Sequence, residues 1–298
     1  MKIKSRAIVF AIDSNYIVPF EVAFFSLVYR GKIEASVPIF ILYEKGRLSV
    51  SDQNKVKRFG DCLGYQFRYI DCTNCLPKTL PIKSQDHVSQ ATFYRLFASS
   101  ILPDDIDTVL YLDCDIVVTQ SLAYLMQVPL NSPVAAVDHF SPSNEFRLWG
   151  EKGGCYFNAG VTLFDLKWMR DNNQEEQFSQ ILKTEFDRIR WWDQDVLNIA
   201  FQDNWQRLPI WYNVSSCAMN FLLQDEVYEQ ACLMHFDGSH KPWDPLNERN
   251  YRDIWLDAYQ ATYGIKFPSL SFSQKLRKIC KKGRSHLKGF WMGERNEW

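Results

Sequence analysis

Short apolar runs alternate with segments of helical spacing through the first part of the chain. Residues 6–12, 37–43 and 65–70 are each short, apolar and followed by a turn, which predicts strands. Residues 17–30 place apolar side chains at helical spacing, and residues 49–60 form a more polar segment of the same kind. Because helix follows strand repeatedly, the pattern predicts an α/β fold with a mainly parallel sheet and helices on both faces.

The second half continues this alternation as far as Pro209, after which the pattern becomes irregular. Strands are expected at 109–112, 134–137 and 157–164, and helices at 89–102, 165–189 and 251–263. No internal repeat or low-complexity linker interrupts the chain. We therefore expect one large domain over residues 1–265, followed by a separate tail over residues 266–298.

The charge of the chain is divided between this domain and the tail. Between Lys275 and Lys288 there are seven Lys or Arg and no acid. The rest of the chain has 27 basic and 35 acidic residues, a net charge of about −8. Apolar tail residues fall near helical spacing: Leu276, Ile279, Cys280, Leu287, Phe290 and Trp291. The tail is expected to be an amphipathic helix that docks on an anionic membrane surface, the alternative being a solvated, disordered charge run. An acidic body argues against nucleic acid as a partner.

Cysteine usage and hydropathy indicate the compartment. The eight cysteines are scattered, and Cys72–Cys75 is a lone CxxC without a second pair, so ordinary thiols are expected. Residues 1–6 are polar and lead directly into a strand, and no apolar run approaches the roughly 20 residues that span a bilayer. We expect a cytoplasmic protein, peripheral at the inner face of the cytoplasmic membrane.

The most informative pattern lies where the strand at 109–112 ends, because two acids follow one residue apart. On a strand, Asp113 and Asp115 would point to the same side, where their carboxylates repel each other unless a cation lies between them. Hard divalent cations bind through oxygen and often keep substrate phosphates in their coordination shell. The pair predicts a metal–diphosphate site; the alternative is a strand-to-turn junction at which aspartate only caps the chain.

A second polar group follows the first strand. Asp13, Asn15 and Tyr16 stand at its carboxyl end, and in open α/β sheets ligands bind beyond these ends, so both groups are expected to face one crevice. The chain contains no GxGxxG after that strand and no GxxxxGK[ST], which argues against a dinucleotide cofactor and a P-loop nucleotidase. Phosphate charge is then left to a metal and to basic side chains.

Four further segments carry candidate chemistry. They are His87–Leu96, which contains Arg95; Phe157–Val161, with Asn158 and Gly160; Trp191–Asp195; and His235–Trp243, in which a histidine precedes a glycine turn and Lys241. Each has a simpler explanation: a surface ion-pair residue, a tight bend, a helix N-cap and a plain turn, respectively. These explanations do not account for all four segments occurring together in this order.

Taken together, the DxD, FNAG, DQD and HFxGxxKPW segments resemble those of the retaining glycosyltransferases of family 8. This group includes bacterial lipopolysaccharide and lipooligosaccharide galactosyl- and glucosyltransferases and, more distantly, glycogenin. The resemblance covers residues 7 to about 245. It implies a GT-A fold, meaning a single Rossmann-like nucleotide-sugar domain, with a UDP-hexose donor (galactose or glucose), Mn²⁺ or Mg²⁺, and an α-linked product.

The same resemblance implies roles for individual residues, grouped by what they would bind. The metal would be held by Asp113, Asp115 and His235; the uridine by Asp13, Asn15 and Tyr16; the diphosphate by Lys241; and the donor sugar by Arg95, Asn158, Asp193 and Gln194. Gly238 and His87 would border the acceptor. The chain departs from the family pattern at Ser14, which is commonly an acid, and at Asp237, a variable position, which weakens the acceptor assignment most.

The chemistry of these residues agrees with hexosyl transfer. A carboxylate such as Asp193 favours an oxocarbenium-like transition state. Retention of the anomeric configuration needs either a covalent intermediate or same-face attack by the acceptor. For a covalent intermediate, Gln194 is a feeble nucleophile and Asp195 is an alternative. We expect same-face attack. The expected acceptor is a lipid-linked oligosaccharide of the lipopolysaccharide-core type. The alternatives are a nucleotidyltransferase, a catalytically silent nucleotide-sugar-binding scaffold and a glycogenin-like self-glycosylating protein.

Overall fold

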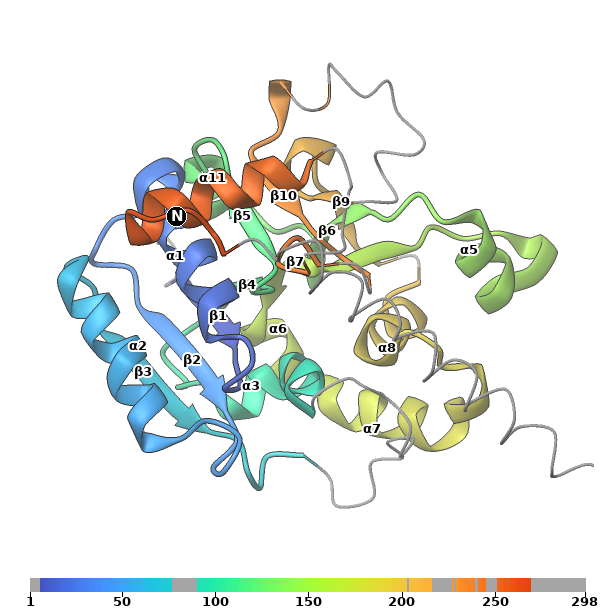
Figure 1. The fold of residues 1–298 in the computed structure, drawn as a ribbon. Coiled ribbons are helices and arrows are strands. Elements are labelled where there is room, and N and C mark those ends of the chain that lie inside the picture. The colour runs from blue at the N-terminus through green and yellow to red at the C-terminus, as the bar shows by residue number, and fades with distance from the viewer. Residues whose placement is uncertain are drawn as a thin grey trace, which may run out of the picture. The chain divides into compact units, whose positions relative to one another are not determined.

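The computed structural model describes residues 6–76, 90–202, 204–215, 227, 229–238, 241–244 and 251–268 (Figure 1). Its contacts divide the chain into two compact units, residues 1–238 and 239–298. The strands of the first unit are β1 Arg6–Ala11, β2 Ile39–Tyr43, β3 Phe67–Asp71, β4 Thr108–Leu112, β5 Ile116–Val118, β6 Val134–Asp138, β7 Phe157–Asp165, β8 Gln206–Arg207, β9 Val214–Ser215 and β10 Leu233–His235. Its helices include α1 Ile17–Gly31, α2 Val50–Cys62, α3 Ala98–Ile101, α4 Ala123–Gln127, α5 Pro142–Trp149, α6 Leu166–Asp171, α7 Gln174–Thr184 and α8 Trp192–Ala200.

The central sheet has seven strands in the order β3-β2-β1-β4-β7-β6-β8. β1 pairs in parallel with β2 and β4, and β2 pairs in parallel with β3. β7 runs antiparallel to both of its neighbours, β4 and β6. The predicted α/β fold with a mainly parallel sheet is therefore confirmed, with β7 as the reversed strand.

Both faces of the inner part of this sheet are covered, which explains why β1 and β4 read as continuous apolar runs. Ile8 and Phe10 of β1 join a core with α1, α2 and α4, whereas Ala7 and Val9 join a second core with α3, α6, α7 and α8. Figure 1 shows these helices on the two sides of the sheet. Side-chain alternation thus places successive residues of one buried strand in different cores.

The helix expected at residues 89–102 takes a different form. Residues Gln90–Phe97 form a 3₁₀ helix, η1, which continues into the four-residue α3. All five residues from Phe93 to Phe97 are buried. The prediction of a helix in this segment is therefore confirmed, but most of the helix is of the 3₁₀ type.

A small three-stranded sheet, in the order β5-β10-β9, brings distant parts of the sequence together. β5 follows the paired acids directly and pairs antiparallel with β10, which places His235 opposite Ile116. β9 pairs in parallel with β10, with Ser215 opposite His235. This sheet positions the candidate site, because it carries His235 to the end of β4.

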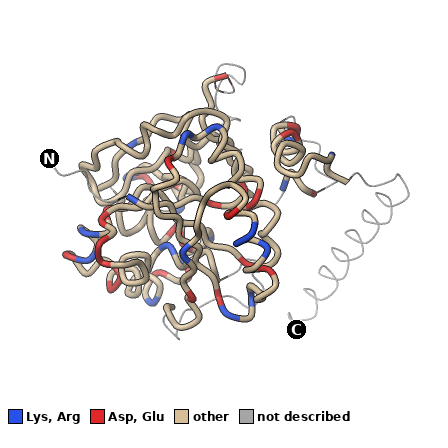
Figure 2. Tube along the Cα trace, turned by 90° about the vertical axis from the view of Figure 1, so that its left-hand side faces the viewer, with Lys and Arg blue, Asp and Glu red and all other residues tan. Residues whose placement is uncertain are grey.

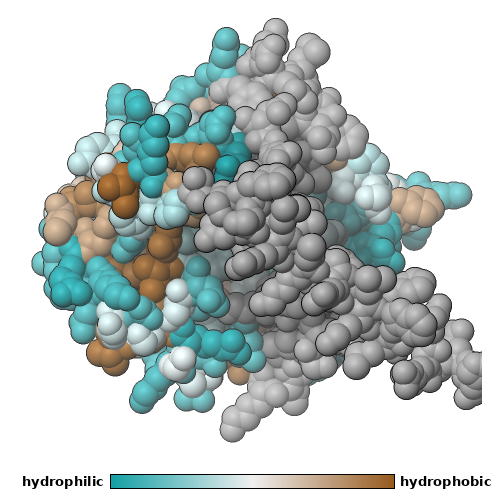
Figure 3. Space-filling view, in the orientation of Figure 1, coloured by the Kyte–Doolittle hydropathy of each residue, from teal (hydrophilic) through white to brown (hydrophobic). Residues whose placement is uncertain are grey.

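The described surface of the chain is mixed in character. Acidic and basic residues are interspersed along the described trace (Figure 2), and apolar groups are scattered among hydrophilic ones on the face seen in Figure 3. Exposed large hydrophobic residues such as Tyr29, Tyr124 and Phe146 come from different helices. Within the described residues, no helix combines the length and the apolar character needed to cross a bilayer.

The second unit contains α11, Arg252–Tyr263, which ends at Gly264 in a left-handed conformation with φ 71°. Trp255 of α11 is fully buried against Trp243, Tyr259 and Phe267. The basic segment after residue 268, predicted as an amphipathic helix, lies outside the described residues.

Candidate active site

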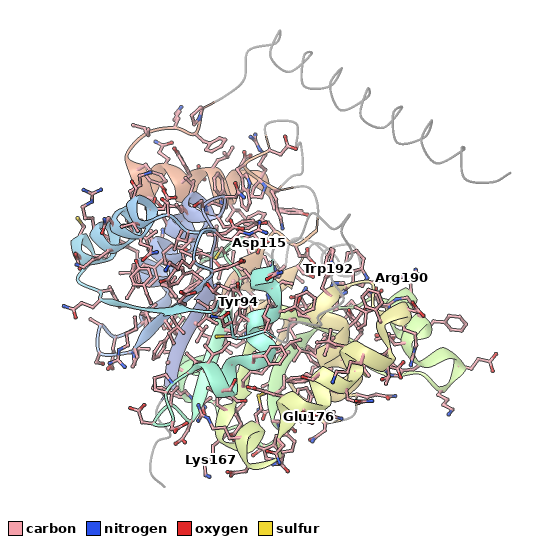
Figure 4. The ribbon with its side chains drawn as sticks, turned by 90° about the horizontal axis from the view of Figure 1, so that it is seen from below. Tyr94, Asp115, Lys167, Glu176, Arg190 and Trp192 are labelled. Carbon is pink, nitrogen blue, oxygen red and sulfur yellow. The ribbon has the colours of Figure 1, made fainter. Side chains whose placement is uncertain are left out.

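Three side chains converge at the end of β4. Asp113 and Asp115 occupy the turn between β4 and β5, and His235 ends β10. His235 Nε2 lies 3.3 Å from Asp115 Oδ1 and 3.7 Å from Asp113 Oδ2, and one ligand atom from each residue fits within 4.8 Å of the others. The two acids face one site, as predicted, but from a turn rather than from a continuous strand. Asp115, labelled in Figure 4, belongs to this cluster.

The two oxygens of Asp113 face different partners. Arg95 Nη2 donates a 2.6 Å hydrogen bond to Asp113 Oδ1, while Oδ2 is the oxygen that faces His235. This arrangement leaves one oxygen of Asp113 for a cation. The surface ion-pair interpretation of Arg95 is wrong, because only 4% of the residue is exposed.

Arg95 links the paired acids to the DQD segment at the start of α8. Its Nε lies 2.9 Å from Asp193 Oδ2, and Thr92 Oγ1 donates a 2.7 Å hydrogen bond to Asp193 Oδ1. Burial raises the pKa of Asp193 to about 6, although the Arg95 charge and the Thr92 hydroxyl oppose this rise. Burial lowers the pKa of Arg95, but attraction to Asp113 and Asp193 outweighs it, so Arg95 stays charged.

The charge balance of this cluster fits a divalent cation. Asp113, Asp115 and Asp193 carry three negative charges and Arg95 carries one positive charge, so two negative charges remain when His235 is neutral. Burial disfavours charge on His235, but Asp115 and the nearby acids outweigh burial and raise the pKa of the imidazole. Two carboxylates and an imidazole suit Mn²⁺ or Mg²⁺ together with substrate oxygens.

The FNAG segment supplies backbone to the site through a bulge in β7. Opposite β6, the register shifts so that Ala136 faces Thr162 while Val137 faces Asn158. At the bulge, the backbone of Ala159 bonds to side chains of the site rather than to β6. Its N–H donates a 3.0 Å hydrogen bond to Gln194 Oε1, and its carbonyl accepts a 2.6 Å hydrogen bond from Arg95 Nη1.

Gly160 lies directly against the cluster of Asp113, Asp115 and His235. A Cβ at this position would stand 2.2 Å from His235 Cε1 and 2.7 Å from Asp113 Oδ2. No side chain fits there without moving His235 or Asp113. The glycine of FNAG is therefore required by close approach to the cluster, since its φ lies outside the left-handed region.

The group after β1 lies near the same acids. Asp13 Oδ1 accepts a 2.8 Å hydrogen bond from the Asn15 N–H, which closes a turn over the end of the strand. Burial raises the pKa of Tyr16, and the charges of Asp115, Asp113 and Asp13 add to this effect. Asn15 is exposed, so its side chain is accessible to a ligand.

The other acid of the DQD segment has a structural role. Asp195 is fully buried, and its Oδ1 accepts hydrogen bonds from Arg147 Nη2 and Tyr156 Oη while Oδ2 accepts from the N–H groups of Arg190 and Trp191. Four donors saturate this carboxylate, which argues against Asp195 as the alternative nucleophile. Trp192, with a left-handed φ of 45°, begins α8 beside it and is labelled in Figure 4.

Gln194 and Asn158 are held by defined hydrogen bonds. Gln194 Nε2 donates to Tyr156 Oη at 3.1 Å. Asn158 is 3% exposed, and its Nδ2 lies 3.5 Å from Asp237 Oδ2. Gly238 is exposed with φ 81°, a left-handed conformation that favours glycine.

Two predicted residues are not placed in this site by the structure. Lys241 belongs to the second unit, and His87 lies outside the described residues. Conversely, three residues of the site were not predicted from the sequence. Thr92 contacts Asp193, and Asn213 contacts His235. The ring centroid of Tyr111 lies 4.1 Å from Arg95 Cζ. Thr92 could have been suspected from its position three residues before Arg95, but nothing in the sequence marks Asn213.

Solved structures with a similar fold define the fold class. The chain is similar to a galactosyltransferase, LgtC, solved in complex with donor and acceptor sugar analogs, with a TM-score of 0.70, 23% identity, and coverage of 90% of this chain and 99% of that one. It is also similar to the glycosyltransferase GlyE of Streptococcus pneumoniae, with a TM-score of 0.63, 22% identity, and coverage of 89% and 66%. The mixed α/β arrangement with a mainly parallel central sheet is the GT-A fold of LgtC.

The chain belongs to glycosyl transferase family 8, whose sequence model matches residues 7–246. It is 33% identical over 186 residues to a lipopolysaccharide 1,2-glucosyltransferase of Escherichia coli, covering 58% of this chain and 53% of that protein. It is 24% identical to general stress protein A of Bacillus subtilis, covering 84% and 91%. The family resemblance drawn from the motifs is confirmed.

Several relatives are longer than this chain. It is 26% identical to the glycosyltransferase GlyF of Streptococcus pneumoniae, covering 84% of this chain and 60% of GlyF. It spans 24% to 30% of three further streptococcal glycosyltransferases.

Proposed function

We propose that this chain is a retaining, metal-dependent hexosyltransferase that moves galactose or glucose from a UDP-sugar to a glycan acceptor and forms an α-linkage. The observation that carries the proposal is the convergence of Asp113, Asp115 and His235 beside the buried Arg95–Asp193 pair. Family membership supports the reaction class.

In this proposal, Asp113 Oδ2, an oxygen of Asp115 and His235 Nε2 hold Mn²⁺ or Mg²⁺. When bound, the cation neutralises the charge that develops on the departing UDP. Asp13, Asn15 and Tyr16 bind the uridine at the end of β1. Lys241 is proposed, from its motif alone, to meet the diphosphate.

The remaining residues act on the sugar. Asp193, kept ionised above its pKa of about 6, stabilises positive charge on the oxocarbenium-like carbon, and Arg95 holds the Asp193 carboxylate in place. Gln194 is a poor nucleophile, since its Oε1 already accepts the Ala159 N–H and an amide oxygen carries little negative charge. These contacts favour same-face attack over a covalent intermediate.

In same-face attack, the bond from the sugar's anomeric carbon to the UDP oxygen breaks. A bond from an acceptor hydroxyl oxygen to that carbon forms on the same side. The hydroxyl proton moves to the departing phosphate oxygen, so UDP leaves as the base, and no protein side chain needs to accept that proton. Asn158 and Gln194 position the donor sugar during this step, and Gly238 borders the acceptor.

We propose a lipid-linked oligosaccharide of the lipopolysaccharide-core type as the acceptor, at the inner face of the cytoplasmic membrane. The similarity to a protein named lipopolysaccharide 1,2-glucosyltransferase supports the acceptor class. The basic residues between Lys275 and Lys288 support an anionic membrane surface as a second partner. Nucleic acid is not proposed as a partner.

A donor panel tests the proposal. The protein is incubated with Mn²⁺ and UDP-galactose, UDP-glucose, UDP-GlcNAc or UDP-GlcA, and UDP release is measured with and without a lipopolysaccharide-core acceptor. We expect release from UDP-galactose or UDP-glucose, increased by acceptor and abolished by Asp113→Asn or Asp115→Asn.

The alternatives give different results in the same panel. A silent scaffold would bind UDP with metal and release none from any donor. A self-glycosylating protein would gain hexose mass without acceptor, visible by mass spectrometry. Full activity in either aspartate variant would contradict the role of the metal.

A further inference from the structure

Asn213 lies behind His235, on the side away from the paired acids. It directly precedes β9, which pairs in parallel with the strand that carries His235. The residue is 1% exposed, and its carboxamide lies between two site residues: Oδ1 is 3.0 Å from His235 Nδ1, and Nδ2 is 2.9 Å from Asn158 Oδ1.

The hydrogen positions in this relay follow from a backbone donor. The Gly160 N–H can only donate, and it lies 2.9 Å from the Asn158 carboxamide, so the Asn158 atom that it meets is the oxygen. The Asn213 atom beside that oxygen must then be Nδ2, which donates. Its other carboxamide atom is Oδ1, an acceptor, and so His235 Nδ1 carries a proton.

From this relay we propose that Asn213 is a positioning residue for the metal site: it holds the proton of the neutral His235 on Nδ1 and so keeps the lone pair of Nε2 facing Asp113 and Asp115. The inference deepens the proposed function, since it concerns the metal of that reaction. The same relay turns Asn158 Nδ2 toward Asp237, where the amide can donate to a sugar hydroxyl.

Local electrostatics make such a residue necessary. Asp115 Oδ1 lies 3.3 Å from His235 Nε2 and attracts a proton to that nitrogen. A neutral imidazole protonated on Nε2 would present a hydrogen instead of a lone pair to a cation. Asn213 Oδ1 supplies the competing acceptor on the other ring nitrogen, as hydrogen-bonded partners of metal-binding histidines generally do.

Two variants separate the two ends of the relay. Asn213→Leu keeps a similar volume but removes both the acceptor for His235 and the donor for Asn158. Asn213→Asp keeps an acceptor for the Nδ1 proton, loses the donor for Asn158 and adds a negative charge beside His235. Asn198→Leu is the matched control, because Asn198 is fully buried and bonds to the backbone of Phe157 and Gln194, with no bond to a proposed metal ligand.

Two measurements report on the relay without using transfer activity. Long-range proton–nitrogen spectra of the metal-free protein, recorded above the titration of the imidazole, should place the His235 proton on Nδ1 in the wild type and on Nε2 in Asn213→Leu. Calorimetric titration with Mn²⁺ alone should show affinity weakened about 10- to 100-fold in Asn213→Leu. Asn213→Asp should retain the proton on Nδ1 and most of the Mn²⁺ affinity, and Asn198→Leu should leave both unchanged.

If Asn213→Leu does not fold, Asn213→Asp still tests the relay through the KM for the UDP-sugar. This KM should rise while Mn²⁺ affinity holds, because the variant removes the donor that orients Asn158 but keeps an acceptor for the His235 proton. The inference is overturned if Asn213→Leu keeps the proton on Nδ1 and wild-type Mn²⁺ affinity, or if Asn198→Leu weakens Mn²⁺ equally. A protein that shows these tautomer and Mn²⁺ results but transfers no sugar would refute the proposed function and leave the relay standing.

Discussion

Adding one methyl group at Gly160 should disable the metal site without unfolding the protein. A Cβ there would stand 2.2 Å from His235 Cε1, 2.7 Å from Asp113 Oδ2 and 2.8 Å from His235 Nε2. Carbon atoms in contact prefer separations of about 3.5 Å or more. The imidazole of His235 must therefore move by roughly 1 Å in Gly160→Ala, whereas metal–ligand distances tolerate only about 0.2 Å.

We expect two separable effects. Overpacking of this kind costs about 1–3 kcal/mol of unfolding free energy, which urea unfolding measures. Loss of the imidazole ligand should weaken Mn²⁺ by at least about tenfold, which calorimetric titration measures, and should reduce UDP release in proportion.

Gly60→Ala provides the matched control. Its Cβ would stand 2.5 Å from Phe67 Cε2, so it overpacks a buried glycine against an aromatic ring and touches no proposed ligand. This variant should lose comparable stability and keep wild-type Mn²⁺ affinity. Gly160→Ala with wild-type Mn²⁺ affinity and UDP release would refute the close-approach argument.

Three further predictions follow from the same site and from the tail. Burial raises the pKa of Asp193 from 3.8 to about 6, so its ionisation costs the folded state about 3 kcal/mol and stability falls as pH rises between these values. Asp193→Asn should abolish transfer. Its unfolding free energy relative to the wild type, measured with urea, should be higher at pH 7 than at pH 4. An equal difference between variant and wild type at the two pH values would contradict this. Arg95→Lys replaces with a point charge the guanidinium that contacts Asp113, Asp193 and the Ala159 carbonyl. It should lower the free energy of thermal unfolding by about 3 kcal/mol and remove most of kcat. A near-normal unfolding free energy and kcat would refute the bridging role of Arg95. Deletion after Ser271 should preserve hydrolysis of the UDP-sugar while abolishing co-sedimentation with anionic vesicles, and unchanged co-sedimentation would disprove the membrane role.

The sequence predicted the layered fold because the inner strands of the central sheet are buried on both faces. β1 and β4 show this as continuous apolar runs whose alternate residues enter different cores. Strand direction was not predictable, since a period of two residues is the same in either direction. The reversed β7 and its bulge at Asn158–Thr162 therefore emerge only from the structure.

Residues of the candidate site were predictable where several of them lie close together in the sequence. Those that only the fold brings together were not predictable. Asp113 and Asp115 stand together, and glycine and histidine motifs mark Gly160 and His235. Arg95 was expected at the donor sugar only from the family resemblance, because five consecutive buried residues from Phe93 to Phe97 have no periodic signature in the sequence. Asn213 is a single asparagine 22 residues before His235, and only the pairing of β9 with β10 brings the two together.

A crystal of the protein grown with UDP and Mn²⁺, measured at the manganese absorption edge, tests the central claim most directly. The account predicts one anomalous peak within bonding distance of Asp113, Asp115 and His235 Nε2, beside the diphosphate of UDP. UDP bound at the end of β4 with no peak within bonding distance of these three residues would contradict it.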